Sequence, residues 1–222
     1  MDRPSLLLIA VLVFVPASPA SAQEALPDGL ADACIETELA DCRVTSAGFM
    51  SLEDGPQVAF QIQRGRDEIN GDGGGVALFE RAGSDDTWRF LTSAFDAYEY
   101  RVPTLAGGSP ITLHVPGYMM GTGNHNADML LAYDGTAWAP VDIDSWKSTI
   151  GKFLPEDREI WKGVDYDFGD WLYGDLTATT PLWDSSDPNC CPSGGDAIIH
   201  FDIVDAVLTV RDVALYLPKS KQ

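Results

Sequence analysis

Residues 57–80, QVAFQIQRGRDEINGDGGGVALFE, place two apolar runs on either side of a polar, turn-forming segment. The runs QVAFQIQ (57–63) and GGVALFE (74–80) are short and contain residues that β-strands favour. Asn70-Gly71 and Asp72-Gly73 lie between them, and such pairs are typical of hairpin turns because they accept positive φ angles. The stretch therefore predicts two antiparallel strands.

The same plan continues toward the C-terminus. Further strand-like runs occupy residues 87–95, 99–105, 110–116, 127–134, 137–142, 158–168, 171–183, 196–205 and 207–217. Strands this frequent predict a mainly β fold, an antiparallel sandwich or barrel-like sheet, and not an alternating βαβ fold. Residues 72–91 and 125–142 share a strand-turn-strand plan. A β-propeller would need further copies of that plan, and we find no third copy in the sequence.

Two helices are expected beside the strands. One N-terminal helix is predicted within residues 23–42, where Asp28 is a suitable cap and a broken apolar stripe follows it. A short helix is predicted near residues 144–154, where Asp144 or Ser145 can cap it and Pro155 lies just past its end.

The first 22 residues have the features of a secretory signal peptide. Arg3 precedes an apolar run over residues 6–15, and Ala20-Ser21-Ala22 forms an A-x-A cleavage site. The apolar run of about ten residues is too short to cross a bilayer of about 30 Å, so a membrane span is not expected. We expect residues 23–222 to form a single β-rich domain that is periplasmic or secreted.

The net charge of −20 limits the partners of the chain. A surface of this sign repels nucleic acid and anionic lipid. It favours cations, basic proteins or simple solubility. Because 45% of the residues are hydrophobic, the acidity does not predict disorder.

Export makes the four cysteines candidates for two disulfides. They are Cys34, Cys42, Cys190 and Cys191. A zinc site is less favoured because adjacent cysteines do not give the C-x-x-C spacing of zinc ribbons. An unbroken helix would hold Cys34 and Cys42 about 12 Å apart, whereas a disulfide needs α-carbons within about 7 Å. Either the helix ends early and this pair closes a small loop, or each cysteine bonds elsewhere.

Two acidic groups are candidate sites. Glu68, Asn70 and Asp72 alternate before Gly73, as oxygen ligands do at the start of a calcium loop, although the closing carboxylate of such loops is missing. An acidic hairpin turn is the favoured interpretation, and calcium is the only cofactor considered. The second group is Asp165, Asp167, Asp170 and Asp175. It suits a calcium site, a glycosidase carboxylate pair or a solvated strand edge.

A glycine-rich segment, residues 117–146, supplies a candidate ligand loop with polar groups between flanking strands. Its polar residues are Asn124, His125, Asn126 and Asp128.

The sequence shows no clear set of catalytic residues. No serine lies in a G-x-S-x-G elbow, and a thiol nucleophile would have to stay reduced in an oxidising compartment.

The segment DPNCCPSGGDAIIHF (187–201) resembles a D-x-x-C-C-P-S-G motif of uncharacterised exported bacterial envelope proteins, including some actinobacterial lipoproteins. GTGNHNADMLL (121–131) shares the resemblance more loosely, and the chain lacks a lipobox cysteine. The resemblance implies an exported, mainly β protein and no particular reaction. It also implies either a Cys190–Cys191 disulfide or links from both residues to Cys34 and Cys42. We favour the first, with Cys34 bonded to Cys42.

These features favour a non-catalytic binding or structural protein of the envelope or the extracellular space. Its ligand is unknown, and a basic protein or a glycan are the classes considered. Two alternatives are an inhibitor of a basic envelope enzyme such as lysozyme, suggested by the charge, and a carboxylate-dependent glycosidase, suggested by the second acidic group.

Overall fold

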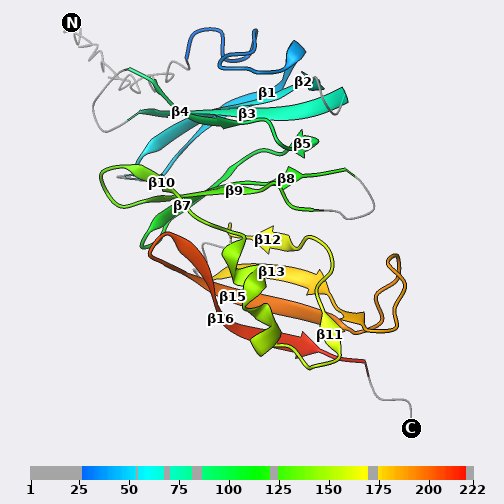
Figure 1. Ribbon diagram of the computed structural model, residues 1–222. Helices are drawn as coiled ribbons and strands as arrows, with labels where there is room; N and C mark the ends of the chain where they lie inside the picture. Colours follow the sequence, from blue (N-terminus) through cyan, green and yellow to red (C-terminus); the bar gives the residue numbers. More distant parts are fainter. Residues whose placement is uncertain are drawn as a thin grey trace, which may run out of the picture.

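The computed structural model describes residues 27–53, 55–67, 71–81, 87–120, 125–169 and 175–218. These residues form three four-stranded antiparallel sheets that are stacked as an upper, a middle and a lower layer (Figure 1). In each layer the strands are hydrogen-bonded in the order in which they occur along the chain. The mainly β, antiparallel prediction is confirmed.

The upper sheet contains the hairpin predicted from residues 57–80. Its strands are β1 (Ala40–Ser51), β2 (Gln57–Asp67), β3 (Gly71–Arg81) and β4 (Arg89–Ala94). The β2–β3 register runs without a shift from Gln57 opposite Arg81 to Asp67 opposite Gly71. The apolar side chains of both strands are buried, which explains why this stretch is so strongly apolar.

The middle sheet has the shortest strands and lies between the other two (Figure 1). Its strands are β6 (Thr104–Ala106), β7 (Ile111–Val115), β9 (Met129–Tyr133) and β10 (Trp138–Pro140). A small pair, β5 (Glu99–Tyr100) and β8 (Gly117–Tyr118), lies beside it. Leu113, Val115 and Leu131 pack against the upper sheet. Leu130 packs against the lower sheet, so the middle layer is covered on both faces.

The lower sheet ends the stack. Its strands are β12 (Asp165–Asp167), β13 (Leu176–Pro181), β15 (Asp196–Val204) and β16 (Val207–Tyr216). Strands β11 (Arg158–Glu159) and β14 (Trp183–Asp184) form a two-residue pair at its edge. The short helix expected near 144–154 is present as two 3-10 turns, η1 (Ser145–Ser148) and η2 (Ile150–Lys152), which bury Trp146 and Ile150.

The prediction of an N-terminal helix is wrong for the described residues. Residues 27–39 form turns and irregular backbone over the outer face of the upper sheet, where Leu30 is buried. The side chains of Gln61 and Gln63, which are buried on β2, bind the backbone of this segment. Gln61 accepts from Ile35 N and donates to the carbonyls of Leu30 and Ala33. Because sheet side chains satisfy these backbone groups, the segment does not need helical hydrogen bonds.

The barrel-like alternative is also wrong, because the described strands form an open stack with no closed barrel. The described strands form three stacked layers, one more than a two-sheet sandwich contains. The repeated plan at residues 72–91 and 125–142 corresponds to the β3–β4 and β9–β10 hairpins, which end the first two layers. The β15–β16 hairpin ends the third layer in the same way. Its turn, Asp205-Ala206, has no glycine and takes positive φ with ordinary residues.

Candidate functional site

A cleft of about 440 Å³ lies at one edge of the upper sheet, and we call it the acidic cleft. Its lining residues are Asp67, Asp72, Gly73, Phe95, Asp96, Ala97, Tyr98, Met119 and Met120. They come from the β2–β3 hairpin, the segment after β4 and the beginning of the loop after β8. The acidic hairpin and the glycine-rich loop of the sequence therefore meet at one cleft.

The glycines of β3 allow this convergence. A β-carbon on Gly75 would lie 2.6 Å from the ring of Phe95, and one on Gly74 would lie 2.9 Å from the carbonyl oxygen of Tyr98. Because both positions lack a side chain, the segment after β4 crosses directly over β3. Gly74 N donates to Ala97 O at 2.9 Å. The glycine run GGG thus places Phe95 and Asp96 in the cleft.

Hydrogen bonds and a cation–π contact hold the cleft wall. Tyr98 N donates to Tyr118 O at 2.9 Å, and Arg64 Nη1 donates to Tyr98 O at 2.9 Å. The Arg64 guanidinium also lies 4.0 Å from the centroid of the Tyr98 ring. The Tyr100 hydroxyl donates to the Asp96 carboxylate. Burial, followed by the contact with Asp96, raises the pKa of Tyr100 well above its usual range.

The opposite wall carries two exposed methionines. Met119 is 39% exposed and Met120 is 68% exposed. Met119 N donates to His125 O at 3.0 Å, which anchors the start of the glycine-rich loop. Unbranched thioether side chains adapt to different apolar surfaces, so this wall suits a ligand with an apolar part.

The candidate calcium residues are only partly covered by the structure. Asp72 is exposed on β3 and lines the acidic cleft. Glu68 and Asn70 lie outside the described residues. Within the ranges that are described, no three His, Cys, Asp or Glu residues are grouped closely enough to hold a metal ion. Calcium binding stays a prediction.

The candidate ligand loop divides into two parts. His125 is exposed near the acidic cleft, and Asn124 lies outside the described residues. Asn126 and Asp128 instead turn toward the lower sheet. Asn126 bonds to both the N–H and the carbonyl of Val164, at 2.8 and 2.7 Å. Asp128 Oδ1 lies 2.7 Å from His114 Nε2, and each of these two side chains is only 4% exposed.

This inward position gives Asn126 and Asp128 a structural role. Asn126 Nδ2 also donates to Asp128 Oδ2 at 2.8 Å. The His114 ring contacts Phe168 edge-on, with centroids 4.8 Å apart. Buried polar groups need hydrogen-bond partners, and these groups find them in one another. Their hydrogen bonds join the middle layer to the lower layer.

Among the described members of the second acidic group, which are Asp165, Asp167 and Asp175, no three acidic side chains are grouped closely enough to hold a metal ion. Asp165 and Asp167 are exposed on β12 and alternate, so they share one face of the sheet. Asp175 accepts from Arg211 Nη2 at 3.0 Å and lies 3.8 Å from His200 Nδ1. Asp170 lies outside the described residues. Because Asp175 is paired with a guanidinium, it is poorly suited to act as a glycosidase acid.

The structure contains both local disulfides. Cys34 bonds to Cys42, with α-carbons 6.2 Å apart, and Cys190 bonds to Cys191. The first closes the loop that leads into β1. The second lies at the exposed end of the loop between β14 and β15.

Asp187 organises the loop that carries Cys190 and Cys191. Its carboxylate accepts from Asp184 N at 2.7 Å, from Ser193 N at 2.7 Å and from Ser193 Oγ at 2.6 Å. These hydrogen bonds, with that from the Ser193 hydroxyl foremost, lower the pKa of Asp187. The aspartate and the serine of the D-x-x-C-C-P-S-G motif therefore close the same loop around the two cysteines.

Sequence reasoning missed most of the acidic cleft. Phe95, Asp96, Tyr98, Met119 and Met120 are not part of any acidic or polar pattern, and their convergence is tertiary. The available signal was the run Gly73-Gly74-Gly75, which indicates a close approach of another backbone.

No family model matches the chain, and no curated protein is similar to it. A solved structure of xylan β-1,4-xylosidase from Bacillus halodurans C-125 matches with a TM-score of 0.33 and 14% identity. The match covers 78% of this chain and 32% of the xylosidase, so the chain spans about a third of that protein's length. In the described part of the chain, no helix is long and apolar enough to cross a membrane.

Proposed function

We propose that this protein is an exported, non-catalytic binding protein whose acidic cleft takes a basic, partly apolar segment of another protein. The observation that carries the proposal is the composition of the cleft. Three carboxylates, those of Asp67, Asp72 and Asp96, lie beside two aromatic residues and two exposed methionines. Carboxylates attract lysine and arginine, while the aromatic and thioether groups accept the apolar side chains between them.

The charge of the whole chain supports the same class of partner. A net charge of −20 attracts basic proteins over distances longer than the contact itself and raises their association rate. The signal-like leader and the two disulfides support a periplasmic or secreted location. Inhibition of a basic envelope enzyme such as lysozyme would be one form of this binding. The glycosidase alternative has less support, because Asp175 is engaged by Arg211.

The test is calorimetric titration of residues 23–222 with two basic probes, lysozyme and a synthetic amphipathic peptide of lysine and leucine. We expect binding at low ionic strength that weakens at least tenfold as the salt concentration approaches about 0.3 M, since screening shortens the range of the attraction. The double variant Asp72→Asn/Asp96→Asn should weaken binding at least tenfold. The amide oxygen introduced by Asp96→Asn can still accept a hydrogen bond from the Tyr100 hydroxyl, so the cleft wall is retained.

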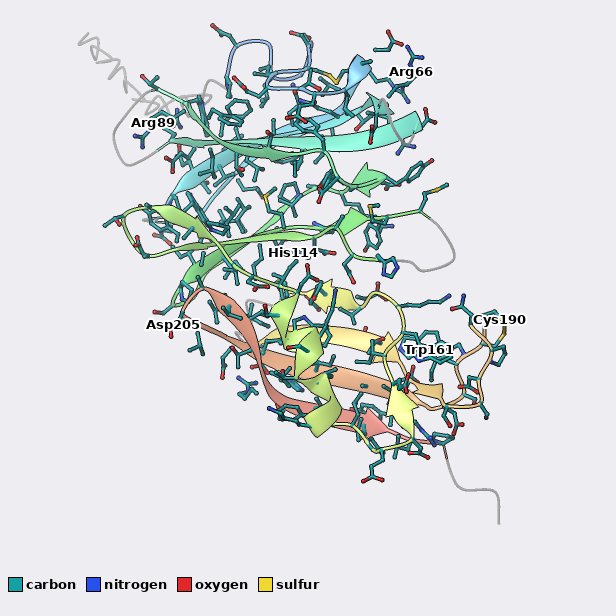
Figure 2. The ribbon with its side chains drawn as sticks, viewed as in Figure 1. Arg66, Arg89, His114, Trp161, Cys190 and Asp205 are labelled. Carbon is teal, nitrogen blue, oxygen red and sulfur yellow. A yellow bond between two sulfur atoms is a disulfide. The ribbon has the colours of Figure 1, made fainter. Side chains whose placement is uncertain are left out.

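A matched control removes two charges elsewhere. Asp205 and Glu156 are exposed on the lower part of the molecule. Figure 2 shows Asp205 far from Arg66, which is the neighbour of the cleft residue Asp67 on β2. The variant Asp205→Asn/Glu156→Gln should change affinity less than twofold. An equal loss in both double variants would mean that net charge alone attracts the probes, and it would refute the cleft as the site. Absence of binding of both probes at low salt would refute the proposed function.

A further inference from the structure

A second surface, at the edge of the lower sheet, carries an exposed tryptophan. Trp161 is 38% exposed and stacks on Trp183, which is 2% exposed. The two rings are nearly parallel, at 12°, with centroids 6.0 Å apart. Figure 2 shows Trp161 beside the loop of Cys190. The acidic cleft has none of these residues in its lining. A flat aromatic ring that remains partly in water offers an apolar face to a ligand.

The Trp161 ring is held in one orientation. Its Nε1 donates to Glu159 Oε2 at 2.5 Å, and Glu159 is paired with Trp183 across the β11–β14 ladder. The Lys162 ammonium lies 5.9 Å from the centroid of the Trp183 ring. Because the indole is fixed by stacking and by a hydrogen bond, a ligand would lose little entropy in ordering it.

The neighbouring loop forms a rigid wall beside the ring. Arg158, next to Glu159, donates to Asp184 Oδ2 at 2.8 Å and to Gly194 O at 3.2 Å. A β-carbon on Gly194 would lie 2.8 Å from Arg158 Cδ, so this glycine allows the loop to pack on β11. The Asp187–Ser193 hydrogen bonds and the Cys190–Cys191 disulfide then fix the rest of the loop.

We propose that Trp161, Glu159 and Lys162, together with the loop of Cys190 and Cys191, form an aromatic platform that binds a neutral glycan. The C–H face of a pyranose ring is apolar and flat, and it matches the exposed indole. Sugar hydroxyls both donate and accept hydrogen bonds, and the platform offers the carboxylate of Glu159 as acceptor and the ammonium of Lys162 as donor.

The platform is separate from the acidic cleft and goes beyond the proposed function. A glycan held at the lower sheet would keep the exported protein on a polysaccharide surface while the cleft at the upper sheet stays open to its partner. The two sites differ in ligand charge, so variants of one should leave binding at the other unchanged.

The experiment is a titration of the chain with neutral linear oligosaccharides of β-linked glucose and of β-linked N-acetylglucosamine. Binding is followed by calorimetry and by the indole N–H signals in NMR spectra. We expect at least one of these sugars to bind and to shift the Trp161 indole signal. Trp161→Ala should weaken binding at least tenfold, whereas Trp161→Phe, which keeps an aromatic face, should weaken it less than fivefold.

Phe153→Ala is the matched control, because Phe153 is 37% exposed and follows η2 rather than belonging to β11 or to the loop of Cys190. It should bind the sugar as the wild type does, and so should Asp72→Asn/Asp96→Asn. If Trp161→Ala unfolds, Trp161→Phe and the indole shift of the wild type still decide the matter. The proposal is overturned if neither sugar series binds, if Trp161→Ala binds unchanged, or if Phe153→Ala loses binding equally.

Discussion

Single hydrogen-bonded side chains decide the local structure at several points of this chain. Asp187 accepts three hydrogen bonds within its own loop. Gln61 donates to backbone carbonyls of the N-terminal segment, which would otherwise be paired within a helix. Asp134 accepts from Thr136 Oγ1, Thr136 N and Ala137 N in the turn after β9, and these bonds lower its pKa to about 2. In each case a polar side chain supplies backbone hydrogen bonds that a regular element would otherwise provide.

The lowered pKa of Asp187 predicts a pH-dependent contribution to stability. A carboxylate whose pKa is lower in the folded state stabilises the fold at pH values above its unfolded pKa, which is near 3.8, and loses that effect as the pH falls through the folded pKa. Thermal unfolding of the wild type and of Asp187→Asn should therefore differ at neutral pH, with the wild type more stable. The difference should shrink steadily below about pH 4.

Ser193→Ala checks the cause. It removes the hydroxyl that contributes most to the shift, so an NMR titration should find the Asp187 pKa closer to 3.8 than in the wild type. An advantage of the wild type over Asp187→Asn that is constant from neutral to acidic pH would contradict the assignment.

At the scale of elements, glycines set how closely neighbouring strands and segments approach. A β-carbon on Gly117, in β8, would lie 2.1 Å from the carbonyl oxygen of Ala127, and the backbones of these residues are hydrogen-bonded at 2.9 Å. Together with Gly74 and Gly75 of β3, this glycine fixes the elements that carry both walls of the acidic cleft. The cleft therefore depends on backbone contacts as much as on its carboxylates.

Gly117→Ala should lower the free energy of unfolding by about 1–3 kcal/mol, because the contact with Ala127 is with backbone and must be relieved by moving β8. It should also weaken binding of the basic probes, since β8 precedes Met119. Urea unfolding and calorimetry measure the two effects. Gly107→Ala, whose β-carbon would meet nothing within 4 Å, should change neither. Equal stability of Gly117→Ala and the wild type would contradict this account.

At the scale of the whole molecule, apolar interfaces and buried polar connections hold the three layers together. The upper and middle sheets share one buried cluster, and the middle and lower sheets share another. Asn126, Asp128 and His114 form a buried polar connection across the second interface, with Val164 as its partner in the lower part. Asn126 directly follows His125, whose carbonyl accepts from Met119 N at the acidic cleft.

Asn126→Ala should lower the free energy of unfolding by about 2–4 kcal/mol, because both backbone groups of Val164, a residue only 3% exposed, lose their partner. Chemical denaturation measures the change. Asn189→Ala is the control, since Asn189 is exposed in the loop of Cys190, and it should have an effect below about 0.5 kcal/mol. Comparable losses in the two variants would show that the connection does not stabilise the stack.

The sequence alone determined the class of the fold and part of the candidate site. Alternating and apolar runs between turn residues specify antiparallel strands, because side-chain period and turn chemistry are local properties. The acidic hairpin at Asp72 and the closed loop around Cys190 and Cys191 are local for the same reason. The tertiary structure alone decided that residues 27–39 are not helical, that Asn126 and Asp128 turn inward, and that Asp96, Tyr98 and Met119 meet Asp72. Those outcomes depend on contacts between residues far apart in the chain, since burial of Leu30 and pairing of Gln61 outweigh local helix propensity.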